Sequence, residues 1–105
     1  EMARIMRQTR ANLPEQFGGI AIERKLDYLT GREYRADGSD VPLADYPASD
    51  VLKFYLAEGT TFVAIRPSGT EPKIKMYFGT VAESMEKAQS QLSYLQGAVR
   101  SHLGV

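Results

Sequence analysis

The 105-residue sequence contains no cysteine, no tryptophan, only one histidine and no excess of either charge. Without cysteine the chain has no disulfide bond and no thiolate metal site, which is typical of a reducing compartment. Thirteen basic residues balance thirteen acidic ones, so the overall positive charge of many nucleic-acid-binding proteins is missing. No apolar run is long enough for a membrane span or a signal peptide. We therefore expect a soluble, cytoplasmic protein that binds neither nucleic acid nor membranes.

The rest of the composition predicts one folded domain over residues 1–105. Hydrophobic residues make up 43% of the chain and charged residues 25%, values that are ordinary for globular proteins. A chain of this length forms one hydrophobic core. The first helical pattern starts at Glu1 without a capping residue, so we expect a fragment of a larger protein.

Two helices are predicted from apolar residues at helical spacing. The first covers residues 1–12 and ends near Pro14. Its arginines lie off the apolar face, which predicts a solvated surface or, as second choice, a contact with another domain: Arg4, Arg7 and Arg10. The second helix covers about 85–103, and we prefer Ser84 to Thr80 as its N-cap because a strand pattern continues through Val81.

Four strands are predicted between these helices. In 20–28, Ile22, Leu26 and Tyr28 alternate with charged residues, and 29–49 has the composition of a long loop. Residues 52–56 and 60–66 form a hairpin, and 73–81 form a fourth strand. We therefore predict an α+β fold, a four-stranded, mainly antiparallel sheet with two helices packed on one face.

Residues 66–75, Arg-Pro-Ser-Gly-Thr-Glu-Pro-Lys-Ile-Lys, are the segment with a recognisable chemistry. Arg66 has the planar fork of donors that grips phosphate, while Ser68 and Thr70 add hydroxyl donors. Gly69 lets the backbone approach an anion closely, and the N–H groups around it can form a concave anion site. Lys75 is a further cation. A polar hairpin loop with solvated charges is the alternative, and it is the better explanation for an arbitrary Ser-Gly-Thr.

The run from Arg66 to Tyr77 resembles the phosphate-binding loop in the C-terminal domain of the α-D-phosphohexomutases, the phosphoglucomutase and phosphomannomutase superfamily. The resemblance extends to 49–54, to the hairpin 55–65, to the helix after Ser84 and to the opening helix. It implies the fourth domain of a larger enzyme, with a fold like that of the TATA-box-binding protein.

That resemblance also implies a reaction. The whole enzyme interconverts hexose 1-phosphate and hexose 6-phosphate through a phosphoserine and a bisphosphate intermediate, with glucose as the expected sugar. The catalytic serine and the Mg²⁺ loop belong to the other three domains, so this domain holds no catalytic residue and no metal, and is expected to be inactive alone. Its partners are then those three domains and the phosphate of the sugar substrate.

By the same resemblance, the phosphate contacts fall on Arg66, Ser68, Gly69 and Thr70. Lys75 matches a position that is often arginine in relatives, and lysine is a point charge where arginine is a bidentate fork. Glu71 lies awkwardly beside an anion, and an ion pair with Lys73 or Arg66 is the favoured explanation.

A second hypothesis is a stand-alone module that binds a phospho-ligand or single-stranded RNA. The aromatic residues in the predicted strands resemble the stacking surface of an RNA-binding sheet. We disfavour RNA because the alternation assigns Phe54, Phe62 and Phe78 to the apolar set and no RNA-recognition motif is present. His102, the single histidine, lies at the end of the last helix, where we expect a contact with the helix dipole or plain exposure and no catalytic role.

Overall fold

A computed structural model of the chain describes residues 2–43 and 47–105, so expectations placed on Glu1 and 44–46 lie outside it. Both predicted helices are confirmed, α1 at Met2–Ala11 and α2 at Met85–Leu103. Within the described residues the strands are β1 Gln16–Phe17, β2 Ile20–Asp27, β3 Arg32–Arg35, β4 Asp40–Pro42, β5 Leu52–Leu56, β6 Thr61–Pro67 and β7 Ile74–Thr80.

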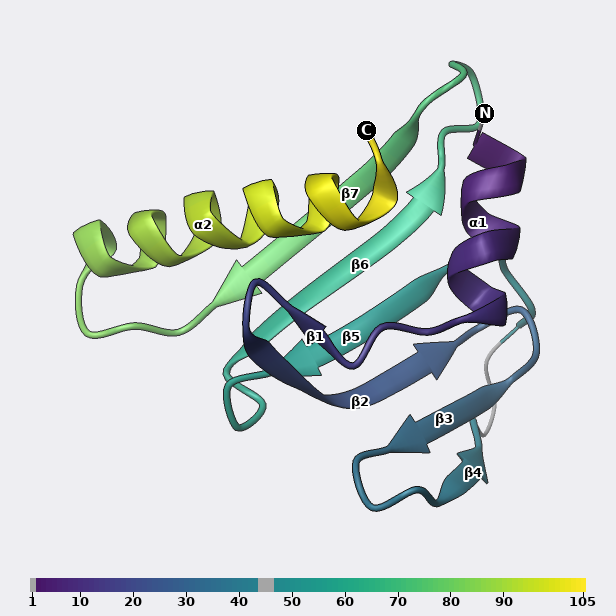
Figure 1. Cartoon of the computed structure of the whole chain (residues 1–105), viewed down its shortest axis with the longest axis horizontal. Helices are drawn as coiled ribbons and strands as arrows, with labels where there is room; N and C mark the ends of the chain where they lie inside the picture. The colour runs from purple at the N-terminus through teal and green to yellow at the C-terminus, as the bar shows by residue number, and fades with distance from the viewer. Residues whose placement is uncertain (1, 44–46) are drawn as a thin grey trace.

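The described strands form one antiparallel sheet in the order β4-β3-β2-β5-β6-β7, with β1 paired to β2 (Figure 1). The α+β class is confirmed, but the sheet has seven strands within residues 2–43 and 47–105, where four were expected. The additional strands are two to four residues long, too short to show a period in the sequence. Two of them, β3 and β4, form a hairpin inside the segment that was expected to be a loop.

Both helices pack on the same face of the sheet (Figure 1). Met6 of α1 and Leu95 and Val99 of α2 are buried there against alternate residues of the central strands. The strand residues of this core include Leu52, Phe54, Leu56, Val63 and Ile65. This burial of two helical stripes on one sheet face is the main stabilising feature of the fold.

A β-bulge in β2 changes which side chains face the helices. The pairing register shifts between Ile22 and Arg24, and Ile22 pairs with Leu56 while Asp27 pairs with Leu52. Residues directly opposite each other share a face of the sheet, so Asp27 lies on the helix-covered face. Leu26 lies on the other face. The sequence-based expectation that Leu26 shares the face of Ile22 is therefore wrong for this half of the strand.

The face of the sheet opposite the helices, here called the open face, carries cations in cation–π contact with aromatic rings. The Arg24 guanidinium lies 4.7 Å from the centre of the Tyr55 ring. Lys53 Nζ lies 5.0 Å from the Tyr55 ring centre and 4.7 Å from that of Phe62. Phe62 pairs with Tyr55, so its expected place in the apolar core is wrong, whereas Phe54 is buried in the core as predicted.

The cap of α2 agrees with the sequence. Ser84 has an extended backbone, and its hydroxyl accepts a hydrogen bond from the N–H of Lys87 at 3.1 Å. This is the N-cap geometry that satisfies a free N–H group of the first helical turn. Thr80, the alternative, is the last residue of β7, and its hydroxyl bonds to that of Thr61. The choice of Ser84 as N-cap is therefore confirmed.

Candidate functional site

The predicted phosphate loop connects β6 to the edge strand β7. Pro67 pairs with Ile74 at the ends of the two strands, and the Ser68 N–H donates to the Lys73 carbonyl at 2.9 Å. These pairings close the base of the loop, which extends beyond the sheet near the start of α1 (Figure 1). The strand β7 begins at Ile74, one residue later than the predicted strand 73–81, so Lys73 belongs to the loop while Lys75 belongs to the strand.

Ser68 organises the loop from inside. Its residue is 3% exposed, and its hydroxyl oxygen accepts hydrogen bonds from the N–H groups of Glu71 at 3.2 Å and Thr70 at 3.4 Å. A serine oxygen that accepts two such bonds keeps its own hydrogen for donation to another acceptor. Two N–H groups predicted to form an anion site are therefore directed at Ser68 in this conformation.

Gly69 is not required by the fold of the loop. Its φ is not positive, and a side-chain carbon built on it meets no atom within 4 Å. Gly18, by contrast, has a φ of +57° and lies against the Tyr94 ring, so a structural reason for glycine is present there. The open space beside Gly69 is consistent with the close approach of a ligand that the sequence predicts.

Arg66 and Lys75 form a pair of like charges at the base of the loop. They lie directly opposite each other on β6 and β7, on the open face of the sheet. Within the described residues, neither forms an ion pair with a carboxylate. Like charges at opposite positions destabilise a sheet, and a bound anion would remove that cost.

Glu71, the one acidic residue in the loop, is paired with Lys73 at 3.2 Å. This confirms the expected ion pair and identifies Lys73, not Arg66, as its partner. Both side chains are more than half exposed, so the pair contributes no more than about 1 kcal/mol to stability. Within the described residues, the carboxylate of Glu71 forms its ion pair with Lys73 and none with Arg66.

A groove of about 780 Å³ follows the outer edge of β7 between the two helices. Of the five predicted site residues only Lys75 lines it; the lining is Met2, Ile5, residues 72–78, Gln96, Arg100 and Val105. Arg66, Gly69 and Thr70 are exposed outside this groove. The loop therefore presents its donors from one side and does not enclose a ligand by itself.

Comparison with known proteins assigns the chain to a family. The family model for the phosphoglucomutase/phosphomannomutase C-terminal domain matches residues 9–92, which include the whole loop. The chain belongs to this family. The phosphoglucomutase of Staphylococcus aureus strain MRSA252 is 42% identical over 73 residues, which are 70% of this chain and 13% of that protein. The phosphoglucomutase of strain MSSA476 is 34% identical over 89 residues, 85% of this chain and 16% of that protein.

This phosphoglucomutase/phosphomannomutase C-terminal domain thus spans less than a fifth of the length of the relatives that it matches. No solved structure gives a significant match. The described residues contain no group of three His, Cys, Asp or Glu side chains that could hold a metal ion. None of the described helices is long and apolar enough to cross a membrane.

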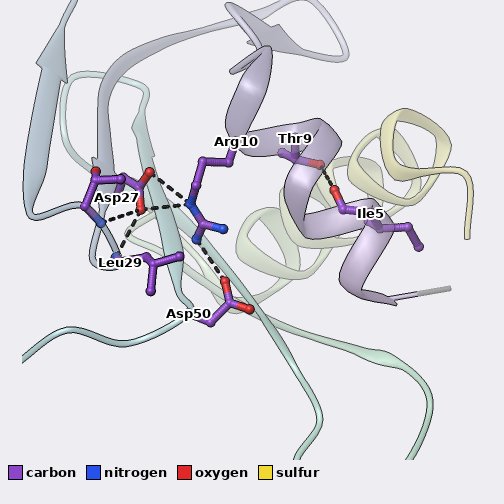
Figure 2. Close-up of polar contacts among 7 residues, drawn as sticks. Ile5, Thr9, Arg10, Asp27, Leu29 and Asp50 are labelled. Atoms are coloured by element: carbon purple, nitrogen blue, oxygen red, sulfur yellow. Dashed lines mark hydrogen bonds and ion pairs between the residues drawn. The ribbon is translucent and has the colours of Figure 1, made fainter.

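The structure also reveals an ion-pair cluster that the sequence did not predict (Figure 2). Arg10 of α1 donates from Nε to both carboxylate oxygens of Asp27, at 3.0 Å each, and from a terminal nitrogen to Asp50 at 2.9 Å. Asp27 also accepts the N–H groups of Leu29 and Thr30. The expectation that Arg10 lies on a solvated surface is wrong, because the β2 bulge directs Asp27 toward α1.

A second carboxylate, Glu33 of β3, lies buried on the open face. Arg24 donates two hydrogen bonds to it, and Arg35 donates a third. The hydrogen bonds from Arg24, assisted by Arg35, lower the pKa of Glu33 to about 2 even though burial opposes ionisation. The strand β3 was not predicted, because its residues are mostly charged and show no apolar alternation. No signal in the sequence marks Glu33 as buried.

Proposed function

We propose that the loop of residues 66–75 binds the phosphate of a phosphosugar for a larger phosphoglucomutase or phosphomannomutase. The observation that carries the proposal is the Arg66–Lys75 pair, two cations held opposite each other with no carboxylate between them among the described residues. Arg66 would bind two phosphate oxygens through its fork of N–H groups, and Lys75 would add a point charge. The sugar phosphate dianion would neutralise both.

The loop supplies further donors for the same group. The Ser68 and Thr70 hydroxyls have hydrogens to donate, and the open space at Gly69 admits an oxygen close to the backbone. Charged hydrogen bonds contribute roughly 1.5 to 3 kcal/mol each, and association costs several kcal/mol, so the domain alone should bind phosphate at about millimolar concentration. An exposed loop that contacts the phosphate from one side needs further residues to enclose the ligand. We infer that other domains of the enzyme supply them.

Membership of the family supports a proposal for the reaction of the whole enzyme. We infer that it interconverts hexose 1-phosphate and hexose 6-phosphate through a phosphoserine and a bisphosphate intermediate, with Mg²⁺ bound in another domain. This domain would hold the phosphate that is not being transferred while the opposite end of the sugar faces the phosphoserine. A loop that recognises only phosphate can accept the sugar in both orientations. The isolated domain, without the serine nucleophile, would be inactive.

A stand-alone binding module is the second candidate, and one observation favours it. Tyr55, Phe62 and Tyr77 place rings on the open face together with cations, a combination used by proteins that bind single-stranded nucleic acids. Cations already cover these rings, however, and stacking a base on them would displace those contacts. Phosphosugar binding at the loop therefore remains the better supported function.

A titration followed by amide NMR separates the two candidates. Inorganic phosphate and glucose 1-phosphate at millimolar concentration should shift the amide signals of Gly69 and Thr70, and neutral glucose should not. A single-stranded RNA that shifts Tyr55 and Phe62 at micromolar concentration, with phosphate inert at the loop, would favour the module. Immunoblotting the source cells adds an independent test, since a larger enzyme requires a band several times heavier than 11.7 kDa.

A further inference from the structure

Arg66 has an aromatic ring beside it where a carboxylate would be the usual partner of an arginine. Its guanidinium carbon lies 5.7 Å from the centre of the Tyr77 ring, within the range of a cation–π contact. Tyr77 is 44% exposed, so its ring is not part of the core. An exposed ring in contact with the principal cation of the loop needs an explanation beyond core packing.

The sheet register brings the two side chains together. Arg66 pairs with Lys75, and Ala64 pairs with Tyr77, so Arg66 and Tyr77 are diagonal neighbours on the open face. Diagonal neighbours on paired strands are within reach of each other when one is aromatic and the other is long. Ala64, opposite Tyr77, is too small to occupy the space between them. The contact is therefore built into the pairing of β6 and β7.

A ring holds an arginine differently from a carboxylate. A carboxylate partner occupies the N–H groups in the plane of the guanidinium, which are the groups that phosphate requires. A ring over the flat face of the cation leaves its N–H groups available, because these point outward in the plane of the guanidinium. The ring also restricts the Arg66 side chain before phosphate binds. Less conformational entropy is therefore lost on binding. Glu71, the nearest acidic residue in sequence, is engaged by Lys73.

We propose that Tyr77 is a positioning residue, which holds the Arg66 guanidinium in place for phosphate while leaving its hydrogen-bond donors free. The inference rests on the proposed function and extends it from the loop to β7. The property that matters is the aromatic ring and not the phenolic hydroxyl. Phenylalanine at position 77 should therefore replace tyrosine, and leucine should not.

The same open face provides a matched control. Tyr55 also contacts cations, Arg24 and Lys53, but it lies on β5, across β6 from Tyr77. Replacing its ring removes cation–π contacts on the same face but leaves the contact of Arg66 with Tyr77 in place. Tyr77→Leu, Tyr77→Phe and Tyr55→Leu can therefore be compared for binding of inorganic phosphate, with the Gly69 and Thr70 amides as reporters and thermal unfolding as a check of the fold.

The expected result is a phosphate affinity about two- to fivefold lower for Tyr77→Leu, with Tyr77→Phe and Tyr55→Leu close to wild type. In the free protein, the Arg66 Nε–H signal should carry a ring-current shift that Tyr77→Leu abolishes. Unchanged affinity in Tyr77→Leu, with a responsive wild type, would overturn the positioning role alone. If wild type itself shows no response to phosphate, the proposed function fails, and this inference fails with it.

Discussion

Arg10 on α1 donates from one nitrogen to both carboxylate oxygens of Asp27, a residue only 2% exposed on β2. Removing Arg10 leaves the buried carboxylate of Asp27 without a counter-ion, and breaking a buried ion pair in this way costs about 3 to 5 kcal/mol. Arg10→Ala should therefore lower the melting temperature by about 15 °C or more. Circular dichroism on heating measures this directly.

Arg7 supplies the control for that variant, because it lies on the same helix, is exposed and forms no ion pair with a described residue. Arg7→Ala should change stability by no more than about 0.5 kcal/mol. If Arg10→Ala has the melting temperature of wild type, the ion pair of Arg10 with Asp27 does not contribute to the stability of the domain.

Glu33 should make the stability of the domain depend on pH. Its pKa is about 2 in the folded chain against 4.5 as its ordinary value, so the unfolded chain takes up this proton first as the pH falls. The stabilisation is complete above pH 4.5 and is lost between pH 4.5 and 2. Its size is at most about 3 kcal/mol, and solvent around the half-exposed arginines reduces it.

Urea unfolding of wild type and Glu33→Gln measures this effect. The difference in unfolding free energy between the two proteins should be largest near neutral pH and should shrink as the pH falls from 4.5 to 2. A difference that stays constant over this interval would show that Arg24 and Arg35 do not lower the pKa of Glu33 in the folded chain.

Gly69→Ala should separate ligand binding from stability. The added methyl group meets no atom of the chain and needs no left-handed backbone, so the melting temperature should be unchanged. If phosphate approaches the backbone here, losing one hydrogen bond should weaken its binding about two- to tenfold. An amide titration measures the affinity, and phosphate affinity equal to that of wild type would remove Gly69 from the site.

Gly79→Ala should have the opposite effect. A side-chain carbon at position 79 would overlap the Phe62 ring, which lies across β7 on the open face. Forcing extra volume into such a contact typically costs 1 to 3 kcal/mol, so roughly that loss of unfolding free energy is expected in urea. The double variant Gly79→Ala/Phe62→Leu should recover part of it. No recovery would mean that the ring is not the obstacle.

Much of the fold was predictable because burial leaves a period in the sequence. The apolar stripe of 85–103 indicates the buried face of α2, and the alternation of Leu52, Phe54 and Leu56 indicates the buried face of β5. The cap at Ser84 was predictable for a related reason, since the strand pattern ahead of it excluded Thr80 as a helix start. Where one face of an element packs on the core, the pattern is sufficient.

The remainder depends on long-range pairing, which leaves no local period. The bulge after Ile22 reverses the two faces of β2, and nothing near Glu23 in the sequence marks it. The strand β3 is composed of charged residues and tyrosine, and its burial of Glu33 depends on arginines from two strands. The ion pair of Arg10 with Asp27 follows from the bulge and could not be predicted without it.

For the candidate site, the sequence predicts residue types but not their arrangement. The pairing of Glu71 with Lys73 was among the expected alternatives, and the structure selects it. The use of the Ser68 oxygen as an internal acceptor was not expected, because short loops form hydrogen bonds that depend on their exact backbone path. The cation–π contact of Arg66 with Tyr77 requires the register of β6 with β7.

The most direct test of the central claim is a phosphate titration of Arg66→Ala beside Arg7→Ala, each followed through the amide signals of Gly69 and Thr70. Loss of the charged hydrogen bonds from Arg66 should weaken binding about ten- to a hundredfold, while the spectrum keeps the dispersion of a folded domain and Arg7→Ala binds as wild type does. Phosphate-induced shifts that persist unchanged in Arg66→Ala would contradict the assignment of this loop as the phosphate-binding site.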